Sequence, residues 1–167
     1  MIELLVTVSI AAILLTLAVP NFRDFLLNSR ISSQGLDLVT ALNFAKSEAT
    51  KRNVTINVCK NTDATTVCSG GSTGWSNGWQ VIVDGNNDCD GNDAGEAILK
   101  VWPALQGNTL CYNGTTGDRI RFQNTGFTPG FAGTYRFCDS RGPANARSVT
   151  VSLLGRTSST AGAAACP

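Results

Sequence analysis

The chain opens with an apolar run, MIELLVTVSIAAILLTLAVPNF, in which Glu3 is the one charged residue. This run is long enough to cross the hydrocarbon core of a bilayer as a helix. It lacks the basic start and the small-residue cleavage site of a secretory signal peptide, and apolar residues continue beyond it at Phe22 and Phe25. The pattern therefore predicts a retained membrane helix that carries a carboxylate.

A helical pattern continues past the apolar run as far as Arg52. Between Asn21 and Arg52 the chain has no proline, and Gly35 is the one weak helix breaker. Small and apolar residues recur there at spacings of three and four, at Gly35, Leu38, Leu42, Ala45 and Ala49, with Leu36 and Val39 beside them. One helix over residues 1–52 would be about 78 Å long, too long for a bilayer, so its second half must pack on a soluble part. We expect Pro20 to kink this helix near the membrane exit.

The pattern then changes to short runs rich in β-branched and aromatic residues, separated by Gly, Asn, Asp and Ser. Most of the runs alternate apolar and polar positions, which is typical of half-buried antiparallel strands. The predicted strands are Val54 to Cys59, Gly78 to Asp84, Ala97 to Trp102, Arg119 to Gln123, Gly133 to Asp139 and Arg147 to Arg156. The predicted fold class is α+β, with a long N-terminal helix whose outer half packs on an antiparallel sheet.

Two segments follow from these patterns. Residues 1–27 form a transmembrane segment, and residues 28–167 form a globular part, with the second half of the helix at 28–52 and a β-rich part at 53–167. A chain of 167 residues with a net charge of +1 shows neither the electrostatic footprint of a general nucleic-acid binder nor an acidic tail. The six cysteines include no C-x-x-C pair, which favours disulfides in an oxidising compartment such as the periplasm or the cell exterior.

Catalytic and metal-binding chemistry find little support in the sequence. The chain has no histidine, the commonest general base and metal ligand, so we expect no enzyme activity and no cofactor. The acidic stretch Asp84 to Glu96 places oxygen ligands at alternate positions, but neither register matches a calcium loop, and a polar hairpin loop is the simpler interpretation. Trp75, Trp79 and Trp102 are interpreted as core or interface anchors.

The residues together resemble a known family. The N-terminal run IELLVTVSIAAILLTLAVPNF resembles the helix of type IV pilins, and the blocks GWQVIVD, GEAILKV, RFQNTGF, GTYRFCDSRG and VTVSLLGR resemble minor pilins and pseudopilins of the GspH/FimT/FimU type. The resemblance extends through nearly the whole chain and implies a pilin-like fold. In this family a basic leader ending in Gly and then Phe-Thr-Leu precede Ile-Glu-Leu, whereas Met1 stands directly before Ile2 here. We expect either a start codon upstream of Met1 or loss of the leader and first residues, so no peptidase site or methylated Phe is assigned.

The resemblance also implies a function. It suggests a single-pass inner-membrane protein with a periplasmic domain that joins a type IV pilus near its tip and primes assembly. Its partners would be other minor and major pilins through the N-terminal helix, the assembly machinery and a tip adhesin. Glu3 occupies the position of the family glutamate thought to neutralise the N-terminal amine of an adjacent subunit, and Glu3 and Pro20 are therefore the predicted assembly residues. A GspH-type pseudopilin of a type II secretion system is the nearest alternative.

A DNA-uptake receptor of the FimT type is an alternative from a different class. Arg141, Arg147 and Arg156 are the candidate contacts for DNA, because phosphate binding needs clustered basic side chains. The associated family motif looks like Gly-Arg-x-Arg, but Ser158 stands in place of the second arginine and the C-terminal tail is uncharged. Solvated or ion-paired arginines are the simpler interpretation, so DNA binding is not favoured.

The cysteine pairing is open on sequence alone, because six cysteines allow 15 connectivities. The family resemblance suggests that Cys166 at the C-terminus is bonded to Cys138. Cys59 and Cys68 lie close together in the sequence and suit a local bridge, which leaves Cys89 and Cys111 for each other.

Overall fold

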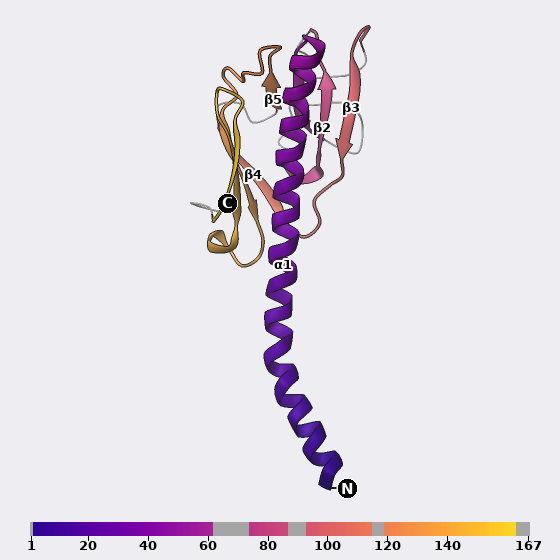
Figure 1. The fold of residues 1–167 in the computed structure, drawn as a ribbon, viewed down its shortest axis with the longest axis vertical. Helices are drawn as coiled ribbons and strands as arrows, with labels where there is room; N and C mark the ends of the chain where they lie inside the picture. The colour runs from indigo at the N-terminus through magenta and orange to yellow at the C-terminus, as the bar shows by residue number, and fades with distance from the viewer. Residues whose placement is uncertain (1, 62–73, 87–92, 115–118, 163–167) are drawn as a thin grey trace.

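The computed structural model describes residues 2–61, 74–86, 93–114 and 119–162. Its first element is a single helix, α1 (Ile2–Arg52), of 51 residues, which at 1.5 Å per residue is about 77 Å long. Figure 1 shows that the N-terminal half of α1 projects away from the rest of the chain, whereas its C-terminal half lies beside the β-strands. The long helix predicted from the sequence is confirmed.

The helix continues through Pro20 and ends at a left-handed residue. Its projecting half is curved in Figure 1, and a proline bends a helix without ending it when the turns on either side are stable. Asn53 follows the last helical residue with φ 57°, and the Val54 N–H donates to the carbonyl oxygen of Ala49 at 3.3 Å. Asparagine tolerates this left-handed conformation better than most residues, and the turn at Asn53 brings the Val54 N–H to a terminal carbonyl of the helix.

The C-terminal half of α1 buries one face. Leu38, Ala41, Leu42, Ala45 and Ala49 have no exposed surface, at the spacings of three and four residues that place side chains on one side of a helix. The three alanines let α1 approach the strands closely. Leu36, expected beside this face, is 64% exposed because it lies on the opposite side of the helix.

The strands form two four-stranded antiparallel sheets. The first sheet has the order β3-β2-β1-β5, with β1 (Ile56–Lys60), β2 (Trp79–Val83), β3 (Ala97–Trp102) and β5 (Arg119–Phe122). The second has the order β4-β6-β7-β8, with β4 (Thr109–Gly114), β6 (Gly133–Cys138), β7 (Arg147–Val151) and β8 (Thr157–Ala161). Short 3-10 helices occur at Trp75–Asn77 and Pro143–Asn145. In Figure 1 strands of both sheets lie beside the C-terminal half of α1.

The hydrophobic core lies between α1 and the two sheets. Val58 and Ile120 from the first sheet, and Phe137 and Val149 from the second, join the buried face of α1 in one cluster. The three tryptophans belong to the same cluster, with exposed fractions of 2% for Trp75, 1% for Trp79 and 8% for Trp102. One shared core therefore holds the helix and both sheets together.

Two strands were not predicted. The sequence pattern predicts one sheet and a single strand from Arg147 to Arg156, whereas that segment divides into β7 and a turn that leads into β8. The β8 residues Thr157–Ala161 are small and polar, and β4 lies in a segment rich in Asn and Gly. Neither strand shows an alternating apolar pattern, and each forms through its antiparallel neighbour, β4 with β6 and β8 with β7.

The cysteines differ in part from the predicted pairs. Cys138 is disulfide-bonded, and its predicted partner Cys166 lies outside the described residues. Cys59 and Cys111 carry thiols, so the structure does not contain the predicted pairs with Cys68 and Cys89, which also lie outside the described residues. The position of a cysteine in its strand, rather than its distance from another cysteine in the sequence, decides which side of the sheet its sulfur lies on. Cys59 is fully buried beside Ile82 on the first sheet.

The pairing of Cys138 gives a first testable prediction. We expect non-reducing peptide mapping to recover Cys138 linked to Cys166, and the variant Cys166→Ser to lose about 3 kcal/mol of unfolding free energy, because the bridge closes a loop of roughly 27 residues. Cys111→Ser is the matched control and should leave the peptide map unchanged. A thiol at Cys166, or its linkage to another cysteine, would show that the pairing is wrong.

Candidate assembly surface

The N-terminal half of α1 is an exposed apolar surface. The large apolar side chains whose burial the structure describes between Ile2 and Leu26 are 50 to 78% exposed, and no described residue in the most apolar stretch of the helix is buried. By length and composition, α1 is the one helix of the described chain that could cross a membrane. Since contiguous apolar surface of this size is unfavourable in water, this surface must be covered by lipid or by other protein.

The polar side chains within this surface are arranged for an apolar environment. Thr7 donates to the carbonyl oxygen of Leu4 at 3.0 Å, and Ser9 to that of Leu5 at 2.7 Å. These hydroxyls are satisfied within the helix itself, as required where no water is available. Glu3 lies in the first helical turn and forms no ion pair with a described residue. Its carboxylate is therefore the one charge of the apolar run that still needs a partner.

An ion-pair link joins the β-rich part to α1 close to the point where the projecting half of the helix begins. The guanidinium of Arg141 binds the carboxylate of Asp139 through Nη2 at 2.7 Å and Nε at 3.2 Å, and its Nη1 lies 3.6 Å from Asp24 Oδ1 on α1. The Asp139 side chain is 1% exposed, whereas that of Asp24 is 62% exposed. The hydrogen bonds from Arg141 lower the pKa of Asp139 and, in return, the pKa of Arg141 is raised.

This link has no counterpart among the contacts predicted from the sequence. Asp139 and Arg141 are visible two residues apart in the block FCDSRG, but Asp24 is 117 residues from Arg141. Such a contact depends on how the whole domain lies along the helix, and a single sequence carries no local signal for it.

The ion-pair link leads to a second prediction. Arg141→Gln should lower the unfolding free energy at pH 7 by about 2 kcal/mol, because Asp139 then stays buried without its charged partner. A lowered pKa means that the carboxylate stabilises the fold above its ordinary unfolded pKa of about 4 and that this contribution is lost as the pH falls through the folded value. The stability difference between wild type and Arg141→Gln should therefore shrink below pH 4 in denaturant titrations.

Asp24→Asn is the matched control, since its exposed carboxylate should contribute less than about 1 kcal/mol. A stability difference between wild type and Arg141→Gln that persists unchanged at pH 3 would contradict this account.

The candidate DNA contacts are not brought together. Arg141 lies at the level of Asp24 on α1, Arg147 lies against Gly35, and the loop before Arg156 binds Lys46 through the carbonyl oxygen of Gly155. The three helix residues that they contact, Asp24, Gly35 and Lys46, follow one another at intervals of 11 residues, which is about 16 Å along the helix axis for each interval. Arg141 is already ion-paired, and Arg147 donates to the hydroxyl of Ser159 at 3.1 Å. The three side chains form no clustered basic surface of the kind that phosphate binding requires.

The acidic stretch forms the connection of a hairpin. Strands β2 and β3 are antiparallel neighbours, and Glu96 accepts hydrogen bonds from the backbone N–H groups of Gly85 and Asn86 at 2.8 and 3.3 Å. Asp84 is fully buried and its carboxylate accepts a hydrogen bond from Asn57. Residues 87–92 lie outside the described part, and within that part no cluster of candidate metal ligands is found. The hairpin predicted for this segment is confirmed.

Comparison with known proteins agrees with this architecture. The family model described as "Type II transport protein GspH" matches residues 34–155. Comparison with curated proteins gave no match.

Among solved structures, the type IV minor pilin FimU of Pseudomonas aeruginosa PAO1 is similar in two crystal forms. The first has a TM-score of 0.65 at 17% identity and covers 86% of this chain and 99% of its own. The second has a TM-score of 0.62 at 17% identity, with 81% and 99% covered.

The minor pseudopilin EpsH from the type 2 secretion system of Vibrio cholerae is similar at a TM-score of 0.50 and 11% identity, with 79% of this chain and 97% of its own covered. At these identities the likeness shows a shared fold, which agrees with the pilin-like fold expected from the sequence.

Proposed function

Because this chain belongs to the GspH family of minor pilins and pseudopilins, we propose that it is a minor pilin of a type IV pilus. In this proposal the subunit is anchored in the inner membrane before assembly, then joins the fibre near its tip and helps to prime assembly. The observation that carries the proposal is the exposed apolar half of α1, which continues without a break into the helix at the core of the globular part. Such a helix can exchange lipid for neighbouring helices while the globular part stays folded.

The proposal assigns a role to each segment. Residues 1–27 form the transmembrane and assembly segment, with Glu3 as its charged group and Pro20 as its bend near the membrane exit. Residues 28–167 form the periplasmic part, a division supported by the first buried core residue of α1, Ile31. The partners are other minor and major pilins and the assembly machinery, with a tip adhesin beyond them. The role is structural rather than enzymatic.

A pseudopilin of a type II secretion system is the second candidate. It is favoured by the family description, which names type II transport, and by the likeness to EpsH. The higher TM-score to FimU favours the pilus. Both systems would use the same apolar helix, so the two functions differ in the partners of the globular part rather than in the anchor.

Gene deletion in the producing bacterium tests the proposal. We expect loss of this chain to reduce surface pili and leave secretion intact, and the complemented protein to be detected by immunoblotting in sheared pili. Unchanged pili together with secreted enzymes trapped in the periplasm would contradict the pilus assignment and support the pseudopilin. A normal phenotype in both assays, with the protein absent from every sheared fibre, would contradict both functions.

A further inference from the structure

Two neighbouring turns of the globular part expose apolar side chains next to each other. Phe127, Leu153 and Leu154 are 48%, 56% and 56% exposed. The N–H of Thr128 donates to the carbonyl oxygen of Leu153 at 2.9 Å, so the two turns lie side by side although β6 and β7 separate them in the sequence. Phe127, Leu153 and Leu154 are called the turn patch below.

The two leucines occupy positions where turns usually carry polar residues. The N–H of Gly155 donates to the carbonyl oxygen of Ser152 at 2.8 Å, so Leu153 and Leu154 are the central residues of the turn between β7 and β8. Gly, Pro, Asn, Asp and Ser dominate such positions, and the neighbouring turn follows this rule with Asn and Thr at residues 124–125. Adjacent exposed apolar side chains at a turn indicate a surface that a partner covers.

Hydrogen bonds within the chain hold the turn patch in place. Lys46 of α1 donates from Nζ to the carbonyl oxygens of Leu154 and Gly155 at 3.3 and 3.1 Å. The hydroxyl of Thr128 donates to the carbonyl oxygen of Ser152 at 2.7 Å. The apolar side chains are therefore presented on a fixed backbone before a partner arrives, which lowers the entropy cost of binding.

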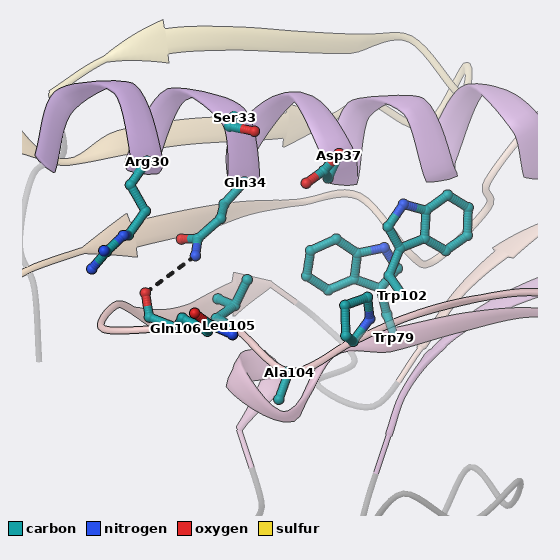
Figure 2. A pocket seen from close by; sticks show the side chains of 10 residues that line it. Arg30, Ser33, Gln34, Asp37, Trp79, Trp102, Ala104, Leu105 and Gln106 are labelled. Carbon is teal, nitrogen blue, oxygen red and sulfur yellow. Dashed lines mark hydrogen bonds between the residues drawn. The ribbon is translucent and has the colours of Figure 1, made fainter. Parts of the chain in front are cut away.

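The hollow between α1 and the segment after β3, about 290 Å³ in volume, offers no comparable surface (Figure 2). Gln34 donates across it to the carbonyl oxygen of Gln106 at 3.4 Å. Trp79 and Trp102 beside it are buried and belong to the core, and Leu105 is half-buried. The chain itself thus covers the large apolar side chains of the hollow, whereas those of the turn patch stay exposed.

The turn patch lies too far from the bilayer to be covered by lipid. Between Pro20 and Lys46 the helix rises about 39 Å at 1.5 Å per residue, whereas the headgroup layer outside the hydrocarbon core is only about 6 Å thick. Figure 1 shows the C-terminal end of α1 at the opposite end of the molecule from the projecting half. The partner that covers the turn patch is therefore a protein.

The size of the turn patch indicates what kind of protein this is. Three half-exposed side chains of this size offer about 300 Å² together, whereas a stable complex between free proteins buries about 800 Å² on each partner. A patch this small is sufficient only for a partner that other contacts already hold nearby at a high effective concentration. Subunits whose apolar helices pack together in a fibre meet that condition.

The charged side chains next to the turn patch are basic. Arg156 follows the two leucines and is exposed, and Lys46 contacts the same turn. Neither forms an ion pair with a described residue. A partner surface with carboxylates around an apolar site would therefore complement this region.

We propose that the turn patch binds a neighbouring pilin-like subunit in the fibre. The neighbour presents an apolar depression that receives Leu153 and Leu154, and carboxylates at its edge that pair with Arg156. The apolar helices bring the two subunits together, and the turn patch then selects which neighbour fits. This inference rests on the proposed function, because it takes the partner to be another subunit of the same fibre.

Site-specific photocrosslinking in the producing bacterium tests this contact. The full-length chain carries benzoylphenylalanine in place of Leu154 or, as the matched control, in place of Val101, an exposed apolar residue of β3. We expect the Leu154 position alone to crosslink to another pilin-like subunit, identified by mass spectrometry, and to give no such product in a strain that cannot assemble pili. No subunit crosslink from Leu154, equal products from both positions, or the same product without assembly would overturn the proposal.

Incorporation into fibres separates this inference from the proposed function. We expect the double variant Leu153→Ser, Leu154→Ser and the single variant Arg156→Glu each to lower the amount of subunit in sheared pili several-fold, with Val101→Ser unaffected. Protease resistance of the globular part checks folding, and Arg156→Glu changes only an exposed side chain. If the patch variants join pili as well as wild type does, the inference fails while the minor pilin function stands. If wild-type protein is absent from pili, the proposed function itself fails.

Discussion

Glu3→Ala is expected to reduce incorporation of the subunit into fibres at least tenfold while its globular part stays folded. Glu3 lies at the far end of the projecting half of α1 and touches none of the core residues. In a fibre the surrounding surface is apolar, and a carboxylate there is stable only when protonated or paired with a cation. A glutamate that pairs with the amine of a neighbour would therefore fix the position of one subunit against the next.

Two further variants show which property of Glu3 matters. Glu3→Gln keeps the shape and the hydrogen-bonding capacity but removes the charge, so it should fail as Glu3→Ala does if charge pairing is required. Thr7→Val is the matched control, because its hydroxyl bonds within the same helix. Incorporation is measured by immunoblotting of sheared pili against the membrane fraction, and folding by protease resistance of the globular part. Wild-type levels of Glu3→Ala in pili would refute the assembly role.

Gly155→Ala is expected to lower the unfolding free energy by about 3 kcal/mol, the largest stability effect that we predict for a single added methyl group. Gly155 has φ 66°, a conformation that costs a residue with a Cβ about 1 kcal/mol. An added Cβ would also lie 2.2 Å from the carbonyl oxygen of Gly126, so the two loops would have to separate. Forced repacking of this kind adds about 2 kcal/mol.

Gly130→Ala is the control that isolates the close contact. Gly130 has φ 81°, but an added Cβ there would have no atom within 4 Å, so only the conformational cost of about 1 kcal/mol remains. Thermal unfolding of the two variants should show melting temperatures several degrees apart, with Gly155→Ala the lower. Equal destabilisation would mean that the loops adapt to the methyl group without cost. The glycine of the Gly155-Arg156 pair is thus explained by the structure of this turn, without a role in DNA binding.

The helix and most of the strands could be predicted because their signals are local. The spacing of Leu38, Leu42, Ala45 and Ala49 marks the buried helix face, and alternation marks strands such as β6. The division into two sheets is not local, since β5 pairs with β1 across sixty residues or more. The small polar residues of β8 become a strand only because β7 offers a pairing edge.

The candidate sites, too, could be predicted only where their signal is local in the sequence. Glu3 is visible from the sequence because one charge interrupts an apolar run. The ion-pair link from Arg141 to Asp24 and the turn patch of Phe127 and Leu153 bring together residues far apart in the chain. No spacing in the sequence indicates these contacts, which arise when the strands pack along the helix. The predicted disulfide of Cys59 was wrong for the same reason, because the direction of its side chain depends on the register of the sheet.

The packing of α1 against both sheets has a mechanical consequence. Its buried residues from Ile31 to Ala49 run nearly parallel to the helix axis, and Arg141 holds the end nearest the projecting half. A pull along the axis loads these contacts in shear, so they must give way together, whereas a sideways pull would separate them one after another. Tension applied to the exposed end of α1 therefore reaches the globular part along the direction in which the contacts between α1 and the sheets resist best.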